Sequence, residues 1–233
     1  MKVRKEANTM NTRNKNKQMS EKIIIGMMLA CVGGFLDAYT YICRGGVFAN
    51  AQTGNLVLLG IRIAEGNLLG SLKYLIPIIA FVLGILIAES VRKRYKNSVR
   101  IHWRQIIIVV ELLVLLGITF IPNGSWYDMI ANVLVSFVCS LQVQSFRKFN
   151  GNAMATTMCT GNLRSATEYF YNYLDNKDKS ELHRSLQYLG VIIVFIIGAA
   201  IGAIVSIILG VKAVILSCIV LSIVFLLMLI NNQ

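Results

Sequence analysis

The chain has 233 residues, of which 56% are apolar and 34 carry a formal charge, 23 of them Lys or Arg and 11 Asp or Glu, for a net charge of +12. Average soluble domains hold about 45–50% apolar and about 25% charged residues. Two stretches, 185–211 and 213–233, contain no charged residue. These features exclude an ordinary soluble globule, a secreted disulfide scaffold and a disordered chain, and they predict an integral membrane protein.

Six segments are long and apolar enough to approach the roughly 20 residues that a membrane-spanning helix needs. They are 23–42, 74–91, 105–121, 129–146, 186–209 and 212–230. The second is the weakest, because it contains Pro77 and ends at Glu89 before a basic run. The last two meet at a short connection and predict a helical hairpin. We therefore expect an all-α membrane protein with six spans.

The basic residues predict how these spans are oriented. Residues 1–22 are rich in Lys, Arg and Asn and favour a disordered basic tail over a cleavable signal. This tail, the 92–104 loop and the 147–185 loop hold 19 Lys and Arg, whereas the opposite side holds 4. Because Lys and Arg in short loops set topology, we expect both termini in the cytoplasm. Charges placed this way face the lipid bilayer and do not indicate nucleic acid.

A tetrapeptide, Thr-Gly-Asn-Leu, occurs at 53–56 and again at 160–163. Shifting the sequence by the offset between these two copies also aligns the first span with the fourth and the third span with the sixth. The chain therefore divides into two predicted repeats, 23–126 and 127–233, of three spans each. Because three is odd, the second repeat enters the membrane from the opposite side, which is the inverted arrangement found in many secondary transporters.

Each Thr-Gly-Asn sequence lies in an uncharged stretch that is too interrupted for a span. We interpret each stretch as a re-entrant or broken-helix segment, with Thr53 and Thr160 as N-caps of short helices. Two helix N-termini directed at each other would attract an anion or the electron-rich end of a polar solute. The alternative is that both sequences are plain turns that cap interfacial helices.

Ionisable residues within spans are functional candidates because they are costly there. Asp37 follows Gly33-Gly34 two-thirds of the way through the first span, and it could bind a cation, carry a proton, or cap a helix near the interface. Its repeat equivalent is the neutral Gln144. Glu111 is either a second proton site or a partner of Arg104, two helical turns earlier.

Other sequence features argue against catalysis. The five cysteines have no paired spacing, and no nucleotide-binding, metalloprotease or hydrolase motif occurs. We therefore expect no cofactor, no metal site and no enzymatic activity.

Three segments together resemble the YoaK-like family of bacterial inner-membrane proteins, a domain of unknown function. They are Gly33–Thr40 (GGFLDAYT), Val47–Leu56 (VFANAQTGNL) and Thr156–Leu163 (TTMCTGNL). The resemblance covers nearly the whole chain from about Lys22. It implies a six-span protein of the bacterial cytoplasmic membrane and implies no substrate.

Our first hypothesis is a small secondary transporter or channel-like permease for a small polar or anionic solute. The predicted solute site consists of Asp37, Thr53, Gly54, Asn55, Gln144, Thr160, Gly161 and Asn162, with Asp37 and Glu111 as candidates for proton coupling. The second hypothesis is a non-transporting scaffold, sensor or partner subunit with structural Thr-Gly-Asn turns. Small residues four apart (Gly84/Ala88, Gly198/Gly202) would suit close packing within a protomer or in a homodimer.

Overall fold

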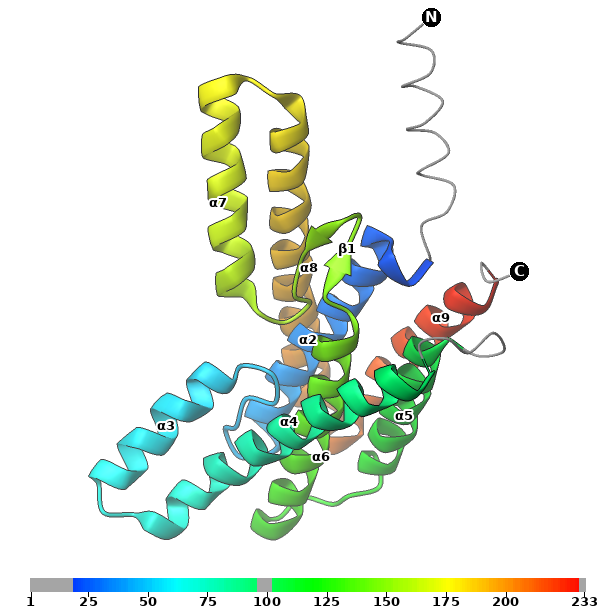
Figure 1. Cartoon of the computed structure of the whole chain (residues 1–233). Coiled ribbons are helices and arrows are strands. Elements are labelled where there is room, and N and C mark those ends of the chain that lie inside the picture. Colours follow the sequence, from blue (N-terminus) through cyan, green and yellow to red (C-terminus); the bar gives the residue numbers. More distant parts are fainter. Residues whose placement is uncertain (1–18, 96–101, 231–233) are drawn as a thin grey trace, which may run out of the picture.

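The computed structural model describes residues 19–95 and 102–230, and almost all of this chain is helical (Figure 1). The elements in order are η1 (Met19–Glu21), α2 (Ile23–Cys43), α3 (Gln52–Ala64), α4 (Leu68–Tyr95), α5 (Trp103–Ile118), α6 (Ser125–Ser145), β1 (Lys148–Phe149), β2 (Asn152–Ala153), α7 (Cys159–Asn176), α8 (Lys179–Leu209), η2 (Gly210–Val214) and α9 (Ile215–Ile230). Most of the predicted tail lies outside the described residues, but its last part forms the 3-10 helix η1.

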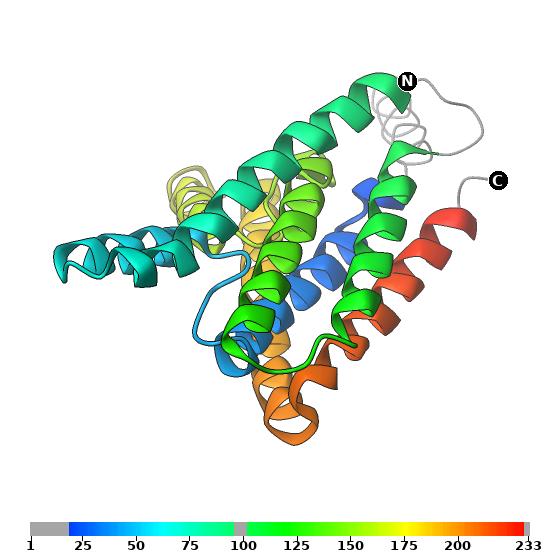
Figure 2. The same cartoon turned by 90° about the horizontal axis from the view of Figure 1, so that it is seen from below.

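The helices α2, α4 and α6, together with the continuous run Lys179–Ile230, are long and apolar enough to cross a membrane. That run has 52 residues, and η2 divides it into α8 and α9, so that α9 turns back from the end of α8 (Figure 2). Helix α5 has only 16 residues, about 24 Å at 1.5 Å per residue, which is short for the hydrocarbon core. Every predicted span falls on a helix, whereas full crossing by α5 and by the equally short α9 stays a prediction.

Small residues let the longest helices pack closely. A Cβ atom on Gly34 of α2 would collide with the backbone of Phe195 in α8, and one on Gly198 would collide with the backbone of Cys31. Likewise, a Cβ on Gly84 of α4 would lie 2.6 Å from the Phe137 oxygen of α6. The small-residue pairs therefore serve packing within one protomer.

The two halves of the chain pack in corresponding ways. In each half a long helix is followed by a short one (α3 or α7) that folds back on the next long one (α4 or α8). The first helix of each half packs on the long helix of the other half, α2 on α8 and α6 on α4. The last helices, α5 and α9, pack on α6 and α2 respectively and also on each other. The halves are thus interleaved and do not form two separate bundles.

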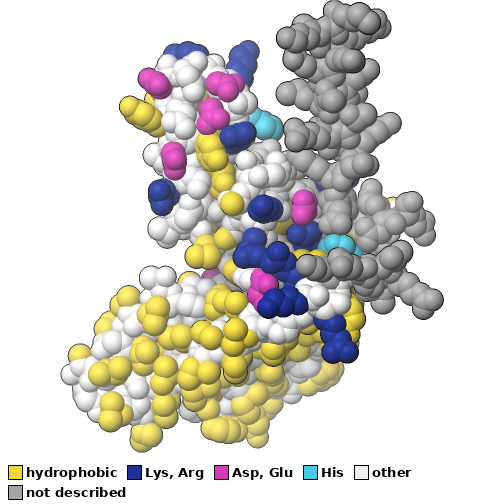
Figure 3. Space-filling model, in the orientation of Figure 1, with side chains coloured by type: hydrophobic (Ala, Val, Ile, Leu, Met, Phe, Trp, Pro, Cys, Tyr) yellow, Lys and Arg dark blue, Asp and Glu magenta, His cyan; other side chains and the backbone are white. Residues whose placement is uncertain are grey.

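Side-chain chemistry divides the surface into an apolar and a charged part. Figure 3 shows apolar side chains covering the lower part of the molecule, around α3 and α4, where Leu56, Leu69 and Leu86 are exposed. Lys and Arg gather above it, near the base of the α7–α8 hairpin and along it. The apolar part suits contact with lipid chains, and the projecting hairpin suits water.

Candidate functional site

The chain that follows α2 returns along that helix to its centre. Asp37 is 5% exposed, and its Oδ1 accepts hydrogen bonds from the backbone N–H groups of Asn50 (2.7 Å) and Ala51 (3.4 Å). The Asn50 side chain donates to the backbone oxygen of Gly33 (3.2 Å), the central residue of α2. The carboxylate therefore holds the start of α3 beside the middle of a long apolar helix.

The corresponding segment of the second half reaches the same place. Gln142 of α6 donates from Nε2 to Thr156 Oγ1 (3.1 Å) and to the backbone oxygen of Leu29 in α2 (3.3 Å). A Cβ atom on Gly33 would lie 2.5 Å from Thr157 Cγ2 and 3.6 Å from Asn50 Nδ2. Segments of both halves thus meet at Gly33. We refer to Asp37, Asn50, Gln142, Thr156 and Thr157, all buried, as the polar centre.

The asparagines of the two Thr-Gly-Asn sequences make equivalent contacts. Asn55 accepts from the backbone N–H of Phe48 (3.1 Å) and donates to its oxygen (2.6 Å). Asn162 does the same with Ala155, at 3.3 and 2.6 Å. The two members of each pair are equally far apart in the sequence, and the repeat offset relates one pair to the other. These amides hold their own segment in place, which is a structural use of the motif.

The predicted threonine caps are wrong. Helices α3 and α7 begin at Gln52 and Cys159, and their N-cap residues, Ala51 and Met158, provide no side-chain cap. Each threonine is the second residue of its helix and not the residue before it. In the first half, the N–H groups of Gln52 and Gly54 bond to the backbone oxygens of residues 50 and 51.

The remaining predicted site residues lie outside the polar centre. Thr53, Thr160 and Gly161 are exposed, and Gly54 lies against the Phe48 ring. Of the predicted solute-binding set, the structure therefore brings only Asp37 into the polar centre. A solute-binding role for the Thr-Gly pairs stays a prediction.

Gln144, the repeat equivalent of Asp37, has a different environment. It is half-buried and donates to Glu89 of α4, which also pairs with Arg92 (3.0 Å) and Arg147 (3.5 Å). The neighbouring Gln142 points to the polar centre instead. The two halves are therefore chemically unequal at this position.

Glu111 does not pair with Arg104, so that alternative is wrong. Arg104 binds Glu21 (3.1 Å), Ser20 (2.8 Å) and the backbone oxygen of Ser145 (3.0 Å) near the end of α6. Glu111 is 0% exposed, and neither of its carboxylate oxygens has a hydrogen-bond partner among the described residues.

Arg44, at the end of α2, is the counterpart of Arg104 at the other end of the bundle. Its side chain is fully buried and makes five hydrogen bonds, one for each of its N–H groups. The acceptors, at 2.8–3.4 Å, are the Tyr39 hydroxyl, the Asp128 carboxylate and the backbone oxygens of Ile118, Ile121 and Pro122. Arg44 joins the end of α2 to the end of α5 and to Asp128 of α6. At the other end of the bundle, Arg104 of α5 binds η1 and the last residue of α6.

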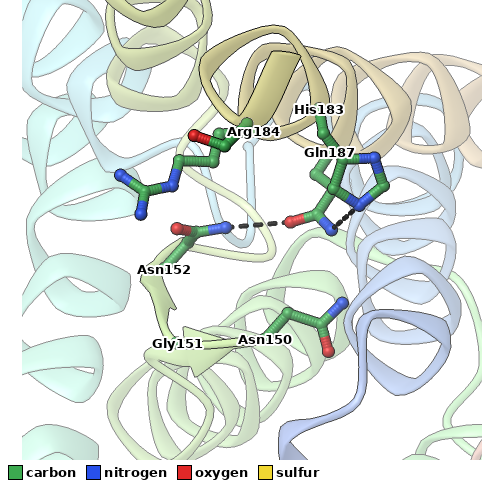
Figure 4. A pocket seen from close by; sticks show the side chains of 7 residues that line it. Asn150, Gly151, Asn152, His183, Arg184 and Gln187 are labelled. Atoms are coloured by element: carbon green, nitrogen blue, oxygen red, sulfur yellow. Dashed lines mark hydrogen bonds between the residues drawn. The ribbon is translucent and has the colours of Figure 1, made fainter. Parts of the chain in front are cut away.

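A separate pocket of about 410 Å³ lies between the β1–β2 turn and the start of α8 (Figure 4). Asn150 (φ 50°) and Gly151 (φ 85°) form this turn, which is the Asn-Gly signature of a tight hairpin. Asn152 donates to Gln187 Oε1 (2.8 Å), and Gln187 lies 2.9 Å from a ring nitrogen of His183. Arg184 completes a polar lining, and the His183 side chain that borders the pocket is exposed.

Sequence reasoning missed Asn50, Thr156 and Thr157 as members of the polar centre. All three are uncharged and lie within the same interrupted stretches that contain Thr-Gly-Asn. The available signal was their position, because Asn50 and Thr157 are themselves related by the repeat offset.

Comparison with known proteins places the chain in a family of unknown function. The profile of the family described as "Protein of unknown function (DUF1275)" matches residues 25–227. The chain is 25% identical over 183 residues to the UPF0700 transmembrane protein YoaK of Bacillus subtilis (strain 168), covering 76% of this chain and 80% of that protein. No solved structure matches the chain.

Proposed function

The chain belongs to the DUF1275 family of YoaK-like membrane proteins, and we propose that it is a small secondary transporter or channel-like permease for a small polar solute. The observation that carries this proposal is the meeting of two non-helical segments, one from each half, at the centre of α2. Non-helical backbone at this depth is stable only when it is buried in protein or lines a cavity. Transporters place their binding sites at such junctions of repeats.

The proposed architecture is a pair of inverted repeats, 23–126 and 127–233, with re-entrant segments at 44–51 and 153–158. Three observations support it: the interleaved packing of the halves, the matching contacts of Asn55 and Asn162, and the return of both segments to Gly33. We place both termini on the cytoplasmic side of a bacterial inner membrane, because the segments rich in Lys and Arg belong to the same side as the termini.

In this proposal the polar centre binds the solute. Asn50 Oδ1 and Gln142 Oε1 are buried there without partners, so each can accept a hydrogen bond from a solute. The Arg44 and Arg104 clusters close the bundle at its two ends and would open in turn during alternating access. No catalytic step is part of the proposal.

A non-transporting subunit is the second candidate, and one observation favours it. The amides of Asn55 and Asn162 each accept from and donate to the backbone of their own segment, as expected of structural turns. This candidate predicts that changes in the polar centre lower stability and alter no flux.

Solid-supported-membrane current with purified protein in liposomes distinguishes the two candidates. A panel of small polar solutes is tested first on the unchanged protein. We expect Asp37→Asn and Gln142→Leu to abolish the current, while Asp175→Asn on the exposed surface of α7 leaves it unchanged. If Asp37→Asn and Gln142→Leu keep full currents, or if no solute gives a current above empty liposomes, the transporter proposal fails.

A further inference from the structure

Glu111 lies on the buried face of α5, together with Ile107, Ile108 and Leu115. Helix α5 packs between α6 and α9 (Figure 2). The Glu111 carboxylate lies within electrostatic range of Cys139 on α6 and of Cys218 on α9. It therefore faces the interior where these three helices come together.

The buried polar side-chain atoms without partners are all oxygens in the described part of the chain. These nine atoms of the described residues are four serine hydroxyls, three amide oxygens and both oxygens of Glu111. The amide orientations are determined by chemistry, because Asn50, Asn132 and Gln142 direct their nitrogens at backbone oxygens, which can only accept. The amide and carboxylate oxygens favour a cation or a hydrogen-bond donor, and the serine hydroxyls can donate or accept.

No basic side chain is available to neutralise Glu111 from within the described chain. Arg44 is the basic residue that is fully buried there, and its N–H groups are already used at the end of the bundle. An ionised carboxylate buried without a partner is too costly to persist, so it either binds a proton or binds a cation.

Two buried hydroxyls without partners lie on α6 and α9, the helices that flank α5. Ser136 lies one helical turn before Cys139 on the same face of α6, and Ser217 directly precedes Cys218 on α9. Both serines are buried and their Oγ atoms have no partner. One carboxylate with neutral oxygens suits a monovalent ion, and the described residues contain no group of three His, Cys, Asp or Glu for a divalent one.

We propose that Glu111, with Ser136 and Ser217, forms a binding site for a small monovalent cation such as Na⁺. When the ion enters, the proton of Glu111 leaves to solvent, so that the site exchanges one charge for another. The site would supply the coupling ion of the transporter, a role that rests on the proposed function, whereas ion binding itself does not. An ion site of this kind favours a polar solute over an anionic one among the solutes that the sequence suggested.

Infrared difference spectroscopy of the full-length protein in lipid nanodiscs tests this site without any flux measurement. We exchange choline chloride for NaCl at constant pH and ionic strength, and then for LiCl, KCl and NH₄Cl. We expect at least one of these ions to remove the band of one protonated carboxyl and add that of a carboxylate. The Glu111→Gln variant should lose this change, and the control Glu65→Gln, an exposed residue of the α3–α4 turn, should keep it.

A second variant guards against misfolding of Glu111→Gln. Ser217→Ala keeps the carboxylate and should weaken the affinity for the ion about 10- to 100-fold, because a bond to a charged group contributes about 1.5–3 kcal/mol. A band that responds to pH but to none of the four ions would overturn the site, as would an unchanged ion response in Glu111→Gln. Ion binding without any solute current would contradict the proposed transport function and would still support the ion site.

Discussion

The buried guanidinium of Arg44 provides the sharpest test of how this bundle is held together. Replacing Arg44 with Ala removes five hydrogen bonds and leaves Asp128 without its ion-pair partner at 3.1 Å. Removing one partner of a buried pair typically costs about 3–5 kcal/mol of the free energy of unfolding. Arg44→Lys should lose about half of that, since one ammonium can still reach Asp128 but has only three donors.

Equilibrium unfolding of the purified protein in mixed micelles measures these losses. The matched control is Arg62→Ala, because Arg62 also pairs with an acidic residue, Glu65 at 2.8 Å, but the two side chains are 43% and 49% exposed. Exposed pairs contribute about 0–1 kcal/mol. The reasoning is refuted if Arg44→Ala loses no more stability than Arg62→Ala.

Three further predictions concern other contacts. Asn55→Asp keeps the acceptor for Phe48 but replaces the donor, and it should cost about 1–3 kcal/mol of unfolding free energy in the same assay; an unchanged midpoint would contradict it. Gly34→Ala should destabilise strongly, since its Cβ collides with the α8 backbone, whereas Gly60→Ala, which meets no atom within 4 Å, should be neutral or stabilising by up to about 1 kcal/mol. Burial, and then the charge of Arg104, lowers the pKa of His102, which caps α5 by accepting a hydrogen bond through Nδ1. Because the pKa of His102 in the folded protein lies below the unfolded value of about 6.5, its contribution to the free energy of unfolding is present above that pH and is lost as pH falls through the lowered pKa. In thermal unfolding, the melting temperature should therefore fall less between pH 7.5 and 5.5 in His102→Asn than in the unchanged protein.

The apolar segments and the Lys and Arg positions were sufficient to predict a helical membrane protein, and every predicted span falls on a helix. The offset between the two Thr-Gly-Asn sequences also predicted the equivalence of Asn55 and Asn162, whose contacts match atom for atom. These properties depend on local composition and on spacing along the chain. They can therefore be inferred from the sequence without knowing how the helices pack.

The partners of the buried polar groups were decided only by tertiary structure. Asp37 binds the backbone at residues 50 and 51, across a loop, and Gln142 binds Leu29, 113 positions away. The threonine caps failed because α3 and α7 begin at Gln52 and Cys159, so that each threonine lies inside its helix. Glu111 could be recognised as buried and ionisable, but the lack of a partner depends on which faces α6 and α9 turn toward it. The partner of a buried side chain depends on contacts between residues far apart in the sequence. Local sequence patterns do not contain that information.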